Sequence, residues 1–511
     1  MSRAPQVDPS PSGGWLGRVE RMGNRVPDAA LIFVIMAVAV PVVSATLAAT
    51  GWVMVHPVTG AEVSVINLLQ PEYIRRMMTE AVPNFVSFPP LGAVLVVMIG
   101  LGVAERSGLI PVALRILVAG VSPRWLSGVL AFAGVMSSVA ADAGFVVLPP
   151  LGAALFAAVG RHPVAGLCAA FAGVSAGHSA NLLLTPLDAL QAGLTQAAAA
   201  LVEPSYVVAP TANYYFMSVS VFLATAFAWI VTDRVVEPRL GPWRPGVRVP
   251  DVADEGVSPR ERKAAGWALV GLLVSVVIIL AMVLPERGWL RSADGALAPF
   301  YRALVPLMAL LFFVPGLIYG WLSGSITGAT TVVSMTSSTI ASLGGYIVLA
   351  FVAAQFIAYF ESSNLGLMLG LGGAEAVQAL GLGGAPLLFG VVVVSATINL
   401  FMVSANGKWA LLAPVVVPLL MGLGYSPELA QAAFRVGDSA TNVVTPLLPY
   451  FPMVIVFAQK YDPSIRLGTL VAAMLPYAAV FLVGWGAFLV LWFLMGWPLG
   501  PDVSLYYPSV P

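Results

Sequence analysis

Six charged residues stand inside long apolar stretches of this chain, and they are the first candidates for chemistry. They are Asp142, Asp188, Glu361, Lys408, Arg435 and Asp438. A charge at membrane depth costs about 2.5–3.5 kcal/mol on insertion scales, so such residues usually face the protein interior and serve a function. Arginine suits the binding of a carboxylate, and aspartate suits the coupling of a cation or a proton.

A polar, proline-containing phrase occurs twice in the apolar sequence. It reads GHSANLLLTPL at 177–187 and GDSATNVVTPL at 437–447, with Gly, Ser, Ala, Thr, Pro and Leu at the same spacing. Proline disturbs the preceding helical turn and frees carbonyl oxygens for an alkali cation, while half-helix N-termini present N–H groups to a carboxylate. Proline alone is common in membrane helices, but the matched duplication favours two helices broken at Thr-Pro within a binding site.

The two copies differ in charge. Arg435 and Asp438 stand three residues apart on one helix face in the second copy, whereas Ser175 and His178 occupy the corresponding places in the first. We therefore expect charge recognition to be concentrated in the C-terminal half. The same spacing also allows Arg435 and Asp438 to neutralise each other as an intrahelical ion pair.

Oxygen-bearing side chains surround these charges in the sequence. The chain has one cysteine and three scattered histidines, so oxygen ligands for Na⁺ or H⁺ are favoured over a zinc site. Asp142 either caps a half-helix or contacts the ligand. We expect no cofactor, and no metal beyond Na⁺ at the hairpin tips described below. The ion-coupling candidates are Asp438, Asp142, Asn399, Ser404, Asn406, Thr445 and Thr185.

Composition identifies an integral membrane protein. Of 511 residues 59% are apolar and 9% charged, and the mean hydropathy is +0.91. Apolar runs of roughly 20 residues match the length of a membrane-spanning helix, and the alternation of a membrane β-barrel is absent. The formal net charge of zero does not suggest a nucleic-acid partner. The lipid bilayer is the expected environment, and no removable signal peptide is recognisable.

The apolar runs predict an all-α fold with two interrupted segments. The blocks 125–160 and 383–421 carry SSVAADAG and SANGK at their centres, which predicts two re-entrant helical hairpins buried in protein or facing water. The expected spans are 29–50, 91–120, 164–200, 214–232, 265–284, 301–321, 344–371, 428–458 and 468–496.

Basic residues set the expected orientation. Arginines are frequent in residues 1–28, and the 233–263 loop is the densest basic cluster, so both should be cytoplasmic. An even number of crossings between them requires the first hairpin to enter and leave on one side. The second hairpin then enters from the opposite face, and the C-terminus lies in the periplasm.

The repeat extends beyond the phrase. Residues 141–163 match 405–427 at Ala, Leu, Pro, Gly and Pro positions, and opposite entry of the hairpins makes this an inverted repeat, typical of secondary transporters. The expected division is 1–28 cytoplasmic segment, 29–120 scaffold, 121–213 first repeat core, 214–380 scaffold and second-repeat helices, 381–458 second repeat core, and 459–511 last helix and tail.

At these residues the chain resembles the p-aminobenzoyl-glutamate transporter (AbgT) family. The resemblance rests on ADAGFVVLPPL, FAGVSAGHSANLLLTPLDAL, FIAYFESSNLG, KWALLAPVVVPLLM and LGYSPELAQAAFRVGDSATNVVTPLLPYFP, and it covers nearly the whole chain. It implies a homodimer in the bacterial inner membrane, with about nine spans and two hairpins per subunit, arranged as a scaffold and an elevator-like core. It also implies an ion-driven transporter of p-aminobenzoyl-glutamate or related aromatic carboxylates.

The resemblance further implies which residues bind substrate. Arg435 would pair with the carboxylates, Trp409 would stack on the aromatic ring, and Asp438 would couple a cation or proton. The substrate-binding candidates are Asn399, Trp409, Pro427, Arg435, Asp438, Pro446, Asp188 and Asn181.

Other functions remain to be weighed against transport of p-aminobenzoyl-glutamate. The nearest alternative is proton-driven export of sulfonamide antimetabolites through the same architecture. An intramembrane aspartyl protease would need two membrane aspartates as an acid–base pair, and the Arg435-Val436-Gly437-Asp438 stretch departs from its Gly-x-Gly-Asp motif. A channel would need a filter-forming loop, which is not recognisable. We therefore do not expect an enzyme.

Overall fold

The chain folds into apolar helices, as predicted. The computed structural model describes residues 29–55, 62–118, 121–140, 143–243, 257–295, 297–381, 383–402, 404–445, 448 and 450–507. Within these ranges the only sheet is a two-stranded antiparallel ribbon of β1 (Val53–Val55) and β2 (Glu62–Ser64). The whole of the expected 1–28 segment and residues 244–256 of the 233–263 loop lie outside the described residues.

Seven described helices are long and apolar enough to cross a membrane, and an eighth span is possible if a bent pair is counted as one. The bent pair is α5 (Pro89–Arg106) and α6 (Leu109–Val118), which meet at 62°. Six of the seven are α2 (Ala29–Ala48), α13 (Pro259–Val283), α14 (Ala298–Ser323), α16 (Gly344–Ser362), α19 (Ala405–Gly422) and α22 (Leu467–Leu494). The seventh helix is continuous over α11 (Tyr214–Val231), the π-helical turn η2 (Thr232–Val236) and α12 (Glu237–Leu240). This is a multi-pass membrane protein.

Each repeat core consists of two hairpin arms and a broken helix. The broken helix packs between both arms of its own hairpin in each repeat. The first repeat has α7 (Leu126–Met136), η1 (Ser137–Ala140), α8 (Ala143–Ala158), α9 (Pro163–Ala176) and α10 (Pro186–Ala199). The second has α18 (Ala385–Asn399), α19, α20 (Pro427–Ala440), η4 (Asn442–Val444) and α21 (Phe451–Gln459).

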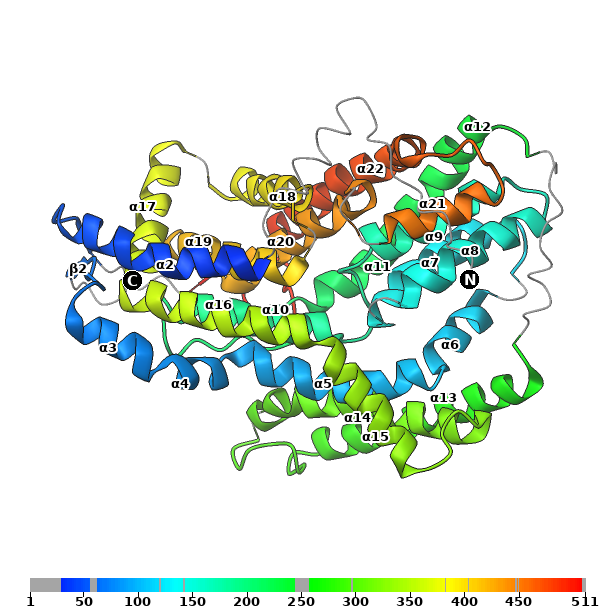
Figure 1. Ribbon diagram of the computed structural model, residues 1–511, viewed down its shortest axis with the longest axis horizontal. Helices are drawn as coiled ribbons and strands as arrows, with labels where there is room; N and C mark the ends of the chain where they lie inside the picture. Colours follow the sequence, from blue (N-terminus) through cyan, green and yellow to red (C-terminus); the bar gives the residue numbers. More distant parts are fainter. Residues whose placement is uncertain are drawn as a thin grey trace, which may run out of the picture.

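The two repeats exchange their last helices. Helix α10 of the first repeat packs against α19 and α20 of the second, and α21 of the second packs against α8 and α9 of the first. Figure 1 shows α21 beside α8 and α9, at a distance from the other helices of its own repeat, α18 and α19. Helices α9 and α20 are entirely buried, so the broken helices form the centre of the molecule.

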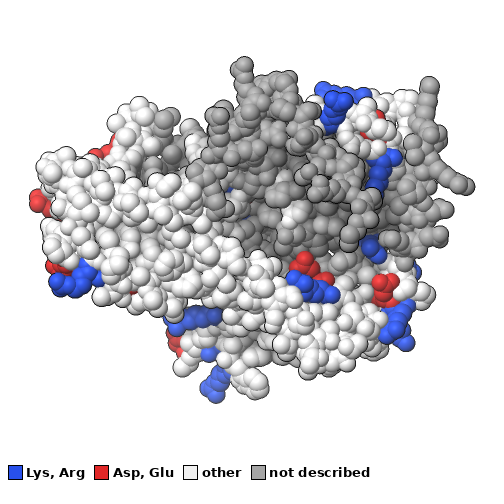
Figure 2. Space-filling model, in the orientation of Figure 1, with Lys and Arg blue, Asp and Glu red and all other residues white. Residues whose placement is uncertain are grey.

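A second group of helices lies along the lower edge of Figure 1. There α14 packs against α5 and α13, and α15 (Ala329–Ser342) packs against α5. Helix α5 also contacts α10, which joins this group to the first repeat. At the left of Figure 1 α2 packs against α16, and Figure 2 shows a broad surface there with few charged side chains, as suits contact with lipid.

Three features differ from the sequence prediction. The expected span 344–371 is divided, because Asn364 adopts a left-handed φ of 60° between α16 and α17 (Leu365–Ala379). Helix α15 was missed because its sequence is rich in Ser and Thr, which are weak helix formers. The short helices α3 (Pro71–Thr79) and α4 (Ala81–Val86) were missed as well, since neither has a long apolar run.

Gly437 lets α20 pack closely against the backbone of α18, which predicts a large effect of adding one methyl group. A Cβ at this position would lie 2.1 Å from the Val392 carbonyl oxygen, so alanine would force the two helices apart. We expect Gly437→Ala to lower the unfolding free energy by about 1–3 kcal/mol or more. Thermal unfolding in detergent would measure this loss. Gly390→Ala on α18 is the matched control, because a Cβ there meets no atom within 4 Å and should leave stability unchanged or higher.

Candidate functional site

The two copies of the repeated phrase meet at their equivalent serines. Ser439 donates a hydrogen bond of 2.7 Å from its hydroxyl to that of Ser179, and both residues are buried. Beside them the Asn442 side-chain amide donates to the Ser175 carbonyl oxygen over 3.2 Å. The duplication therefore produces a direct contact between the repeats at the centre of the molecule.

The two phrases nevertheless fold differently after this contact. In the first, α9 ends at Ala176 and α10 begins at Pro186, directly after Thr185. In the second, α20 continues to Ala440 and α21 begins only at Phe451. The reason is local, since Thr-x-x-Asp forms a capping box at the start of α10, whereas Thr445 is followed three residues later by an apolar residue. The expected break at each Thr-Pro is thus a helix start in the first repeat only.

Arg435 and Asp188 form an ion pair between the repeats. The Arg435 Nη1 lies 2.7 Å from Asp188 Oδ1, and Nη2 donates to the Ser179 carbonyl oxygen over 2.8 Å. The second carboxylate oxygen of Asp188 accepts from the Thr185 backbone N–H and hydroxyl, each at 2.7 Å. The side chains of the pair are 2% and 8% exposed, so the pair is shielded from water.

Lys408 and Asp438 form a second ion pair within the second repeat. The Lys408 ammonium contacts both Asp438 Oδ1 and Asn399 Oδ1, and both charged side chains are 0% exposed. The side-chain nitrogen of Asn399 lies 2.6 Å from the Asp438 carbonyl oxygen and 2.9 Å from the Thr441 hydroxyl. Arg435 and Asp438 therefore each pair with another helix, in place of the intrahelical pair that their spacing allowed.

Trp409 lies against the same helices. Its indole N–H donates to the Thr195 hydroxyl over 2.9 Å, and that hydroxyl lies 2.8 Å from Gln431 Oε1. Its ring stacks on Phe434 with centroids 4.6 Å apart. Trp409, which is 0% exposed, and the Arg435–Asp188 pair thus both lie where α10, α19 and α20 pack together.

The other predicted residues occupy supporting positions. Asn181 donates to the Ser138 hydroxyl at the tip of the first hairpin over 2.6 Å, and the Ser404 hydroxyl caps α19 by accepting from Gly407 N. Thr445 donates to the Thr441 carbonyl oxygen, and Pro427 opens α20. Asn406 has a buried side-chain oxygen without a hydrogen-bond partner among the described residues. Asp142 and Pro446 lie outside the described residues.

Glu361, a charge expected at membrane depth, is exposed at the end of α16, away from these contacts. Asp188, the partner of Arg435, and Asn399, which contacts Lys408, were among the predicted site residues. Lys408 stood out only as a charge in apolar sequence and was given no role in the site. The residues that the prediction missed are Ser175, Ser439, Asn442, Thr195 and Gln431.

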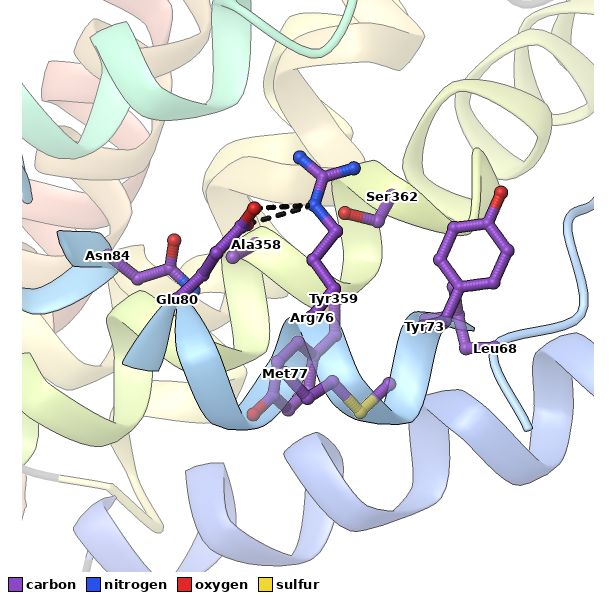
Figure 3. A pocket seen from close by; sticks show the side chains of 9 residues that line it. All are labelled: Leu68, Tyr73, Arg76, Met77, Glu80, Asn84, Ala358, Tyr359 and Ser362. Atoms are coloured by element: carbon purple, nitrogen blue, oxygen red, sulfur yellow. Dashed lines mark hydrogen bonds and ion pairs between the residues drawn. The ribbon is translucent and has the colours of Figure 1, made fainter. Parts of the chain in front are cut away.

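A small pocket lies away from this centre, between α3, α4 and α16. Figure 3 shows Arg76 and Glu80 at its edge, joined by an ion pair of 2.9 Å, with Tyr73 and Ser362 nearby. None of the predicted site residues lines it. The described residues contain no group of three or more His, Cys, Asp or Glu side chains that could hold a metal ion.

Known proteins resemble this chain over its whole length. The model of the AbgT putative transporter family matches residues 14–507. The p-aminobenzoyl-glutamate transport protein of Escherichia coli (strain K12) is 37% identical over 516 residues, which cover 100% of both chains. The YdaH transporter of Alcanivorax borkumensis has a TM-score of 0.87 at 43% identity, covering 93% of this chain and 100% of that chain.

MtrF of Neisseria gonorrhoeae, described among a class of antimetabolite efflux pumps, has a TM-score of 0.91 at 38% identity, covering 96% of this chain and 100% of that chain. The polar centre built from two repeats, the multi-pass helical fold and these full-length similarities agree. The chain belongs to the AbgT putative transporter family.

Proposed function

We propose that this protein is an ion-driven secondary transporter of p-aminobenzoyl-glutamate or related aromatic carboxylates. The observation that carries the proposal is the buried Arg435–Asp188 pair between the repeats, with Trp409 on the neighbouring helix. A guanidinium binds a carboxylate through two parallel hydrogen bonds, and an indole offers a face for an aromatic ring. Substrate carboxylate would take the place of Asp188 on Arg435 when the repeats part.

The Lys408–Asp438 pair contains a carboxylate to which a coupling cation or proton can bind. Asp438 is held by one ammonium group and is completely buried, so any cation that binds this carboxylate must displace Lys408 or share the site with it. A proton on Asp438 would release Lys408 in the same way. Both Na⁺ and H⁺ therefore remain candidate coupling ions, with Asn399, Thr441 and Thr445 supplying further oxygen atoms nearby.

We also infer the setting in which this step occurs. From the resemblance to the family and from the basic residues of the sequence we infer a homodimer in the bacterial inner membrane, with the N-terminus in the cytoplasm and the C-terminus in the periplasm. The helices α5, α13, α14 and α15 would form part of the scaffold past which the repeat core moves. Catalysis is disfavoured because Asp188 and Asp438 each bind a separate cationic side chain and do not face each other as an acid–base pair.

Export of sulfonamide antimetabolites is the second candidate function. It is favoured by the similarity to MtrF over 96% of this chain. A sulfonamide drug shares the aminophenyl ring of p-aminobenzoyl-glutamate but lacks its carboxylates. Transport of p-aminobenzoyl-glutamate would therefore use Arg435 to bind a carboxylate, whereas transport of a sulfonamide would not. The two functions also differ in the direction of transport.

Flux in proteoliposomes would test both proposals. Labelled p-aminobenzoyl-glutamate is supplied while Na⁺ and proton gradients are imposed separately and in both orientations. We expect accumulation that requires one of the two gradients and that excess unlabelled substrate suppresses. Flux that is indifferent to both gradients would contradict secondary transport, and export of a labelled sulfonamide without transport of p-aminobenzoyl-glutamate would establish the second candidate instead.

A further inference from the structure

Gln191 is a buried glutamine whose amide group is unused. It is 0% exposed, and neither its side-chain nitrogen nor its oxygen has a hydrogen-bond partner among the described residues. Leaving such a buried group unpaired costs about 1–3 kcal/mol. Nearby Arg435, at 1% exposure, has an Nε–H that also lacks a partner there. The Gln191 side-chain nitrogen and oxygen and the Arg435 Nε–H, three N–H donors and one acceptor oxygen in all, are thus left without partners among the described residues near the contact of α10 with α20.

The position of Gln191 relates it to both parts of the candidate site. It stands three residues after Asp188 and four before Thr195, so the three side chains share one face of α10. Asp188 binds Arg435, and Thr195 binds Trp409. Gln191 therefore lies one helical turn from the arginine contact and one turn from the tryptophan contact, on the helix that packs against both α19 and α20.

We propose that Gln191 is a specificity-determining residue that binds the amide linkage of an aromatic acyl-amino acid. The inference rests on the proposed function, in which the carboxylates go to Arg435 and the ring to Trp409. The group between them in p-aminobenzoyl-glutamate is a secondary amide with one N–H and one C=O. In a trans secondary amide the N–H and the C=O point in opposite directions, so one carboxamide binds one of them, and the Gln191 oxygen suits the N–H.

Two of the unused groups match this ligand. The Gln191 oxygen accepts from the linkage N–H. The Arg435 Nε–H donates to the carboxylate, which also takes the guanidinium contact now made by Asp188. A site whose buried polar groups are completed only by the correct ligand discriminates strongly against an analogue that lacks one of them.

The test replaces the amide of the substrate and the amide of the protein separately. Wild-type proteoliposomes are given p-aminobenzoyl-glutamate and the ester analogue in which oxygen replaces the linkage N–H. We expect the amide to be transported at least about ten-fold more efficiently than the ester. In Gln191→Met, which keeps the size of the side chain, this preference should fall to within about two-fold through loss of amide transport.

A control variant, Gln196→Met, and a measurement of thermal unfolding accompany this test. Gln196→Met removes an amide on the same helix whose partners are the Tyr206 carbonyl oxygen and the Val208 backbone N–H, and it should keep the wild-type preference. Gln191→Met should also unfold at a higher temperature than wild type without ligand, because two unpaired groups are removed, and it should lose the stabilisation that p-aminobenzoyl-glutamate gives to wild type.

The possible results separate the inference from the function on which it rests. If wild type carries the amide and folded Gln191→Met shows the same amide-to-ester ratio, the role of Gln191 is wrong while the proposed function stands. An equal loss of preference in Gln196→Met would also overturn it. If wild type carries neither compound, the proposed function fails, and the role assigned to Gln191 fails with it.

Discussion

Arg435→Ala will abolish transport of p-aminobenzoyl-glutamate, and of the substitutions considered it should have the largest effect. The change removes the carboxylate-binding guanidinium and leaves Asp188, with 8% side-chain exposure, without its counter-charge. Breaking a buried pair in this way costs about 3–5 kcal/mol of stability. We therefore expect less folded protein as well as no flux, measured by thermal unfolding and by uptake into proteoliposomes at equal protein content.

The double variant Arg435→Met with Asp188→Asn separates binding from folding. Asparagine still accepts from Thr185, so α10 keeps its cap, and no buried charge is left unpaired. We expect this variant to recover most of the lost thermal stability and none of the transport. Recovered transport would mean that Arg435 serves the fold and does not bind substrate.

Neutralising Lys408 or Asp438 singly will remove gradient-driven transport. Both side chains are 0% exposed, so Lys408→Met or Asp438→Asn leaves one buried charge and should lower stability by about 3–5 kcal/mol. The double variant Lys408→Met with Asp438→Asn should fold nearly as well as wild type, because the charges are removed together. The measurement is thermal unfolding, followed by flux with Na⁺ and proton gradients imposed separately.

The flux of this double variant tests whether the Lys408–Asp438 pair couples transport to an ion gradient. We expect it to show no accumulation of substrate against its gradient under either ion gradient, since the titratable or cation-binding carboxylate is absent. Normal accumulation in the double variant would show that Lys408 and Asp438 are structural. Control experiments with Asp462→Asn, a half-buried aspartate in the turn before α22, should match wild type in both measurements, because asparagine still accepts from Ser464.

Much of the fold could be predicted because the relevant signals are local or repeated. Apolar length identified most spans, and polar sequence within apolar blocks located the breaks between α7 and α8 and between α18 and α19. The match between 163 and 427 aligned two helices that both have 14 residues, α9 and α20. Helix α15 escaped because its Ser and Thr residues resemble a loop in composition, although packing against α5 holds it helical.

The partners in the site could not be predicted, because they depend on how the helices cross. Arg435 and Asp438 share a helix face, and this spacing is compatible with mutual pairing or with separate partners. The structure chooses separate partners, since α10 of the other repeat brings Asp188 to Arg435 and α19 brings Lys408 to Asp438. The roles in substrate binding and ion coupling that the resemblance assigned to Asn399, Trp409, Arg435 and Asp438 stay predictions until flux is measured.

The capping box at Asp188 has an electrical consequence. Asp188 is part of α10, and one of its carboxylate oxygens accepts twice from Thr185. The carboxylate therefore stays in place at the start of α10 when its other oxygen releases Arg435. Parting the repeats at this pair would separate a fixed negative charge on α10 from a positive charge on α20. One unit charge moved across the whole membrane field corresponds to about 2.3 kcal/mol per 100 mV, so the opening of this pair should respond to voltage.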